Sequence, residues 1–155
     1  MKITVKKEVK QYVNEELEIT GATLLSIEEA EKLPIELRKY NCWWWLLSSD
    51  NNFLRAPIVN YDGTPRRNGD FVEHRDNVVR PALQIENMQF SNLKIGDIFE
   101  FGGKPFKIIT DELAFCLSDI GTCKFRKDWK SKDANDYEKS DVKKYVDDWF
   151  NNVSA

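Results

Sequence analysis

Lysine is absent between Lys39 and Lys94, although it is the most common basic residue on both sides of that gap. Five of the seven arginines lie inside the gap, and these are Arg55, Arg66, Arg67, Arg75 and Arg80. A surface that only keeps a protein in solution can use either cation. Arginine, however, offers five donors in a rigid fork and stacks on planar groups. An arginine-only stretch therefore indicates a recognition surface.

The sequence also lacks several features that would indicate a metal site, a membrane protein or a nucleic-acid binder. The chain has one histidine, His74, and three cysteines without the paired spacing of a zinc site, so we expect free thiols in a reducing compartment, no metal and no cofactor. The sequence contains no apolar run long enough to predict a transmembrane helix. The first ten residues, MKITVKKEVK, lack the apolar core of a secretory signal. A net charge of -3 is unlike that of most nucleic-acid binders. We expect a cytoplasmic or virion-associated protein that contacts neither membrane nor nucleic acid, with its oligomeric state left open.

Length and periodicity predict a single α+β domain over residues 1–155. Ser26 and Glu29 form a capping-box pattern that predicts a short helix over 27–33. A second helix is predicted over 140–151, with Ser140 at its N-cap, because apolar residues recur there at helical spacing. That apolar stripe consists of Val142, Tyr145, Val146, Trp149 and Phe150. We expect it to pack against the sheet.

Short apolar runs predict the strands, and residues 1–20 also favour strand over helix. The runs lie at 22–25, 43–47, 56–61, 71–72, 78–85, 96–109 as a hairpin, and 113–117. Because strand side chains alternate, Trp43 and Trp45 share one face and Trp44 takes the other. This two-sided pattern predicts that 43–47 and 78–85 belong to one central sheet. Asp62-Gly63 and Asn68-Gly69 predict tight turns, and Trp129 is expected to anchor the irregular segment 125–136.

Several motifs resemble a widespread uncharacterised bacterial and phage domain that carries W-W-L-R-S-P, A-x-x-V, D-G and V-R-P-A-L. Here they read Trp44-Trp45-Leu46-Leu47-Ser48-Ser49, Ala56-Pro57-Ile58-Val59, Asp62-Gly63 and Val79-Arg80-Pro81-Ala82-Leu83. Leu47 and Ser49 replace the Arg and Pro of the family pattern. The segments 96–109 and 137–141, which usually come first, follow here, so the order resembles a circular permutation. Residues 22–88 would form the family's lectin-like half, and 89–155 the hairpin and C-terminal helix.

The resemblance implies a C-type-lectin-like fold with a small mixed or antiparallel sheet and two short helices. Formylglycine-generating enzymes and the variable proteins of diversity-generating retroelements share that fold. The chain has neither the calcium motifs of true lectins nor a convincing cysteine pair for formylglycine generation. With His74 as the only histidine and no nucleophile motif, we do not expect an enzyme. The variable proteins are the nearest functional analogue.

Retroelement diversification mutates adenines, typically in AAC or AAT codons, which cannot become Lys, Glu, Gln, Met or Trp. Between Leu46 and Arg80 only Glu73 belongs to that forbidden set. Short strands joined by turns favour the same permitted residues, so this alternative explanation of the composition stays open. The clustered arginines and the phenylalanines at 53 and 71 fit diversification better.

These observations predict a ligand-binding face made by the loops 48–55, 64–71 and 73–77. Its candidate residues are Asp50, Asn51, Asn52, Phe53, Arg55, Arg66, Arg67, Asn68, Phe71, His74, Arg75 and Asp76. The partner would be a protein or a glycan, bound by a module of the retroelement-diversified kind. The alternative is a phage or prophage accessory protein that inhibits a host factor through the same kind of surface.

Overall fold

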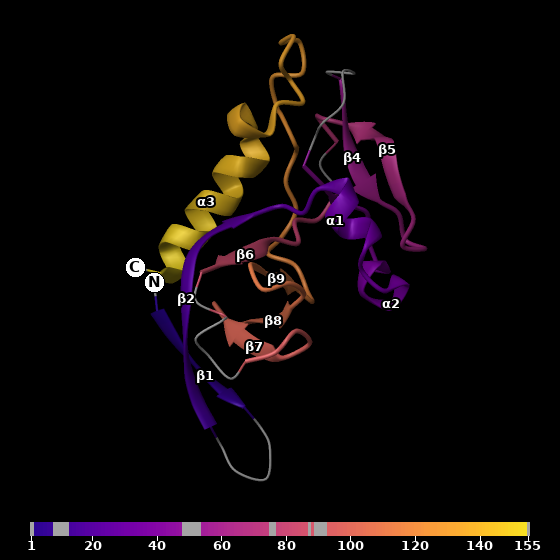
Figure 1. Cartoon of the computed structure of the whole chain (residues 1–155). Coiled ribbons are helices and arrows are strands. Elements are labelled where there is room, and N and C mark those ends of the chain that lie inside the picture. Colours follow the sequence, from indigo (N-terminus) through magenta and orange to yellow (C-terminus); the bar gives the residue numbers. More distant parts are fainter. Residues whose placement is uncertain are drawn as a thin grey trace.

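The computed structural model describes residues 2–7, 13–47, 54–74, 77–86, 88 and 93–154, with side chains described from Leu17 onward (Figure 1). Two antiparallel sheets and a few helices make it an α+β protein, as predicted. The strand preference of the first 20 residues is confirmed, because they contribute to two paired strands. In the view of Figure 1 both ends of the chain lie beside the C-terminal helix.

The larger sheet has six strands in the order β1-β2-β6-β9-β8-β7. Their bounds are β1 Lys2–Lys7, β2 Val13–Thr23, β6 Ala82–Ile85, β7 Ile98–Phe101, β8 Lys104–Ile108 and β9 Leu113–Cys116. The predicted hairpin over 96–109 is confirmed as β7 and β8, and the strand over 113–117 as β9. One face of this sheet holds a cluster of aliphatic and phenylalanine side chains.

The smaller sheet has the order β3-β4-β5, with β3 Trp44–Trp45, β4 Arg55–Val59 and β5 Pro65–Phe71. The prediction that 43–47 and 78–85 share one central sheet is wrong, because Trp44 meets Val78 only in an isolated bridge while β6 lies in the other sheet. The alternation of the tryptophans is confirmed. Trp44 and Trp45 are both fully buried, and they pack into two different core clusters.

The two turn predictions for this sheet have different outcomes. Asp62-Gly63 does form the tight turn between β4 and β5, with Gly63 at φ 85°. Asn68-Gly69 is not a turn but lies inside β5, next to a register irregularity. Gly69 has φ 33°, and a Cβ there would lie 1.8 Å from the backbone oxygen of Ala56. The glycine is therefore required by close approach to β4 rather than by a reversal of the chain.

The helical segments whose bounds are described are α1 Ile27–Glu31, α2 Ile35–Arg38, the 3₁₀ turn η2 Tyr137–Lys139 and α3 Asp141–Ser154. The capping box is present, since Glu29 N donates to Ser26 Oγ at 3.1 Å and Ser26 N donates to Glu29 Oε1 at 2.8 Å. Helix α1 ends before the predicted Leu33. Ser140 caps α3, accepting at Oγ from Lys143 N at 3.0 Å.

Helix α3 packs against β2 and joins the two halves of the core, which confirms the predicted apolar stripe. Its first turns bury Val142 and Val146 beside Trp45, whereas Trp149 and Phe150 pack on the larger sheet. Within the described residues, no helix combines the length and the apolar composition that a membrane crossing needs.

Candidate functional site

Six of the predicted ligand-binding residues lie outside the described part of the chain: Asp50, Asn51, Asn52, Phe53, Arg75 and Asp76. The other six lie on the β4–β5 hairpin or directly after it, and these are Arg55, Arg66, Arg67, Asn68, Phe71 and His74. We call this second set the hairpin surface. In Figure 1 the hairpin lies on the opposite side of the molecule from α3.

An arginine and an aromatic ring are stacked at the end of the hairpin where β4 begins and β5 ends. Arg55 and Phe71 are cross-strand partners, and the Arg55 guanidinium carbon lies 4.1 Å from the centroid of the Phe71 ring. Arg55 Nη1 also lies within 3.5 Å of the carbonyl oxygens of Asn68 and Gly69. Phe71 is nevertheless 44% exposed. The pair is therefore a pre-ordered surface element that combines an apolar face with unused donors.

Arg66 and Arg67 are both exposed, as the sequence predicts, but they occupy the strand β5 rather than a loop. As successive strand residues they point to opposite faces of the sheet. Arg67 Nη2 lies 3.3 Å from Glu28 Oε1 of α1. On the other face, the Asn60 amide, oriented with its oxygen toward Arg66, accepts from Arg66 Nε at 2.9 Å and Nη2 at 3.2 Å. A partner would have to reach around the hairpin to contact both.

The turn after β5 is organised by Asp70, which the sequence interpretation did not single out. Asp70 is buried and accepts from Asn77 Nδ2 at 2.8 Å and from Phe71 N at 2.8 Å. His74 Nδ1 lies 2.9 Å from the same carboxylate, although the imidazole itself is exposed. Asp70 therefore fixes the position of His74 and of the Phe71 backbone together.

A long irregular segment, residues 125–136, lies beside the hairpin surface. Arg126 N donates to Val72 O at 2.8 Å, which attaches the segment to the residue after β5. Lys127 N donates to Asp141 Oδ2 at 2.6 Å, which attaches it to the first residue of α3 as well. In Figure 1 this segment extends past the N-terminal end of α3.

Asp133 holds the segment together from inside. Its carboxylate accepts from Ser131 Oγ, from Lys139 Nζ at 2.9 Å and from Arg126 Nη2 at 3.4 Å. The Ser131 hydroxyl first, and then Lys139, lower the pKa of Asp133 to about 2. The carboxylate is thus charged at all physiological pH values, and the loop is kept in one shape by its own polar contacts.

Trp129 lies on this segment and is 43% exposed, so the prediction that it anchors the segment in the core is wrong. The buried anchor is Phe125, whose ring packs edge-on at 5.4 Å from Trp45 and lies 6.5 Å from Tyr137. Lys130 Nζ lies 5.6 Å from the Trp129 ring centroid. The only sequence signal for an exposed tryptophan is the density of lysines on both sides of it.

Arg80 belongs to the core and not to a recognition surface. It is 2% exposed, and its guanidinium lies 4.4–4.8 Å from the centroids of three rings. Those rings belong to Tyr40, Trp44 and Phe115. Arg80 Nε donates to Ser118 O at 3.2 Å and Nη1 to Leu37 O at 3.0 Å. Burial lowers the pKa of Arg80 to about 10. The arginine-rich gap therefore mixes a structural residue with surface ones.

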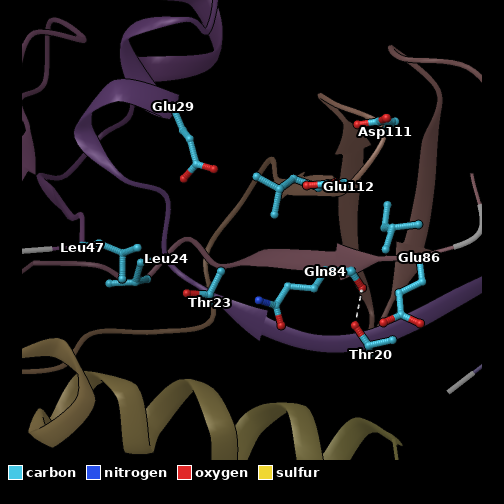
Figure 2. A pocket seen from close by; sticks show the side chains of 11 residues that line it. Thr20, Thr23, Leu24, Glu29, Leu47, Gln84, Glu86, Asp111 and Glu112 are labelled. Atoms are coloured by element: carbon cyan, nitrogen blue, oxygen red, sulfur yellow. Dashed lines mark hydrogen bonds between the residues drawn. The ribbon is translucent and has the colours of Figure 1, made fainter.

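An open cavity of about 950 Å³ lies between β2, β6, α1 and the turn before β9. Figure 2 shows the side chains that line it. The carboxylates of Glu29, Glu86, Asp111 and Glu112 line it, and Thr20 Oγ1 donates to Gln84 O at 3.5 Å. Glu29 is already engaged in the capping box. In the described part of the chain, no three His, Cys, Asp or Glu side chains gather to hold a metal ion.

Comparisons with protein-family models, with curated proteins and with solved structures give no match for this chain. The likeness to the bacterial and phage domain therefore stays a prediction from the motifs, and the geometry of the hairpin surface and of segment 125–136 carries the functional argument.

Proposed function

We propose that this protein is a ligand-binding module that recognises a protein or a glycan through the hairpin surface. The observation that carries the proposal is the stacked Arg55–Phe71 pair, because it holds at the surface an aromatic ring that is 44% exposed and belongs to none of the three core clusters. Exposed rings and arginines of this kind dominate the binding energy of many protein interfaces. Arg66 and Arg67 add an exposed guanidinium group on each of the two faces of β5.

A C-type-lectin-like fold for residues 22–88, with the hairpin as a retroelement-diversified surface, is the finer form of this proposal. Its support is a small antiparallel sheet that follows two short helices, with the motif residues on β3, β4 and the Asp62-Gly63 turn. An inhibitor of a host factor in a phage or prophage would use the same kind of surface, and the structure favours neither source.

The coding DNA tests the finer form. A diversified gene should carry codons derivable from AAC or AAT at positions 49–77, with a reverse-transcriptase gene nearby. Isolates of the same gene should then differ at Arg66, Arg67 and Asn68 but not at Asp70, which organises the turn. Variation spread evenly over the chain, or concentrated at core positions, would remove the diversification hypothesis and leave the binding module.

A binding experiment tests the proposal itself. Ligands are first selected on the wild-type protein from a glycan array and a random-peptide display library. Exchange of both Arg66 and Arg67 for lysine should then weaken their binding by about tenfold or more, because lysine keeps the charge but lacks the fork. The melting temperature should barely change, since the Arg67–Glu28 pair is exposed and such pairs contribute little.

The matched control exchanges Lys39 and Lys94, two exposed lysines outside the gap, for arginine. This variant should bind the selected ligands as the wild type does. Phe71→Ala should weaken binding as well, by removal of the apolar anchor. If selected ligands bind the Arg66 and Arg67 variant, the Phe71 variant and the control equally well, the hairpin surface is not the binding site.

A further inference from the structure

The positive charge of this acidic protein is concentrated in one segment. The nine residues 124–132 contain five basic side chains and one acidic side chain, a net charge of about +4. The whole chain has a net charge of -3, so the remainder of the molecule carries about -7. Such segregation is unusual for a charge that serves only solubility, where both signs are normally interspersed.

Three of these basic side chains, Lys127, Lys130 and Lys132, are exposed. Within the described part of the chain none of them forms an ion pair, whereas Arg126 is largely covered and paired with Asp133. Trp129 lies among the three lysines with 43% of its surface exposed. Lysines that form no ion pair with the described residues, grouped around an exposed tryptophan, favour an anionic partner with some apolar surface.

The segment is ordered before any partner arrives. Asp133 links Arg126, Ser131 and Lys139, and Asp141 accepts from the backbone of Lys127. Binding would therefore cost little conformational entropy in the loop, which is the condition under which a small surface can bind measurably.

The segment is also continuous with the hairpin surface. The hydrogen bond from Arg126 N to Val72 O joins it to the residue after the exposed Phe71, and Phe71 is stacked on Arg55. Two exposed aromatic rings and four cationic side chains thus lie on two adjoining segments. This contact links the predicted recognition surface to segment 125–136, which the sequence interpretation did not include in the binding face.

We propose that Lys127, Trp129, Lys130 and Lys132 form a docking surface for an acidic segment of a partner protein, continuous with Arg55 and Phe71. The inference rests on the proposed function and adds the charge class of the partner. Nucleic acid fits less well. Binders of nucleic acid commonly neutralise about 6–10 phosphates, and a strand leaving this surface would meet the acidic remainder of the molecule. A broad anionic membrane would meet the same repulsion, whereas a short acidic segment touches the basic surface alone.

The test measures fluorescence anisotropy of labelled probes with the full chain. The first probe is a short peptide in which Glu alternates with Leu, and its uncharged partner has Gln in place of Glu. Oligothymidylate and vesicles that contain phosphatidylserine are the other probes. We expect saturable binding of the Glu peptide, weaker binding of the Gln peptide, and a loss of affinity with rising salt.

Two double variants with the same change in net charge locate the site. Exchange of Lys127 and Lys130 for Glu should weaken binding of the Glu peptide by about tenfold or more, whereas the same exchange at Lys39 and Lys94 should change it by less than about threefold. Trp129→Ala should weaken it as well, and Trp129→Phe should retain most of it. A thermal melt of each variant shows that the fold is unchanged.

Equal losses in the two charge pairs would overturn the inference, because the effect would then be one of net charge alone. No saturable binding of the Glu peptide would overturn it too, as would tighter binding of oligothymidylate or of the vesicles. The proposed function fails separately. If the Glu peptide binds through Trp129 but the Arg66 and Arg67 exchange changes nothing for any selected ligand, the loop binds and the β5 part of the hairpin surface does not.

Discussion

Arg80 offers a test of how a charge is kept inside this fold. Its guanidinium is enclosed by three aromatic rings and donates to two backbone carbonyls. Hydrogen bonds from a charged donor contribute about 1.5–3 kcal/mol each, and a desolvated cation–π contact about 2 kcal/mol. Taking the charge out of water costs several kcal/mol in return. The net contribution of the charge is therefore small, although each separate term is large.

This balance predicts an order of stability among three substitutions. Arg80→Ala should lower the free energy of unfolding by about 3–5 kcal/mol, because it leaves a cavity between the rings. Arg80→Met fills much of that space without a buried charge and should cost about 2 kcal/mol or less. Arg80→Lys keeps the charge, but its ammonium is more strongly hydrated and cannot stack on the rings. We expect the lysine variant to be less stable than the methionine variant.

Urea unfolding followed by tryptophan fluorescence measures all three, and Trp44 reports directly because its ring lies 4.8 Å from the guanidinium carbon. Equal slopes against urea would show that the compared states are the same. If Arg80→Lys is as stable as the wild type, or more stable than Arg80→Met, then positive charge rather than planar stacking holds this position. Stacking of the guanidinium between the rings would then be the wrong explanation for the buried charge.

Four further outcomes are expected. Trp149→Ala should lower the free energy of unfolding by about 3 kcal/mol, as the loss of a large but half-buried ring, and an unchanged melt would assign the ring to a partner. Gly69→Ala should cost more than about 2 kcal/mol because of its clash with β4, whereas Gly103→Ala, with open space around it, should cost about 1 kcal/mol. The pKa of Asp133 is about 2 in the fold and near 4 in an unfolded chain. The stabilising effect of the carboxylate is therefore complete above about pH 4 and is lost as the pH falls through 2. Acrylamide quenching of tryptophan fluorescence should rise in that pH interval, and Asp133→Asn should raise the quenching already at pH 7. Removal of calcium with a chelator should leave the melting temperature unchanged, since no lectin calcium motif is present.

The elements that the sequence predicts correctly are those whose information is local. The capping box at Ser26 and Glu29 needs only four consecutive residues, and the hairpin of β7 and β8 needs only a Gly-Gly pair between two alternating runs. The apolar stripe of α3, from Val142 to Phe150, spans about two and a half turns and so leaves little choice of period. In each case any other local structure would lose the capping contacts, the turn or the apolar periodicity that these residues provide.

Asn68-Gly69 is a dipeptide whose structure the neighbouring sequence does not predict. The dipeptide favours a tight turn, and both residues tolerate the backbone conformations that such a turn needs. The same glycine, however, also permits the backbone of β5 to approach Ala56 closely, and the long pairing of β4 with β5 decides between the two uses. A register of this kind is set by the partner strand, which the sequence around Gly69 does not contain.

The positions of Arg80 and Trp129 follow from competition for space, and residue type alone predicts the reverse of what is found. Three rings from separate segments make an enclosure in which a planar cation can stack, so one arginine of the lysine-free gap is buried while Arg66 and Arg67 stay at the surface. In the other core cluster Phe125 already packs on Trp45, and a second large ring from the same segment would have to displace it. Trp129 is therefore left in water beside three exposed lysines, and the core packing that excludes it also creates the surface for which a partner is proposed.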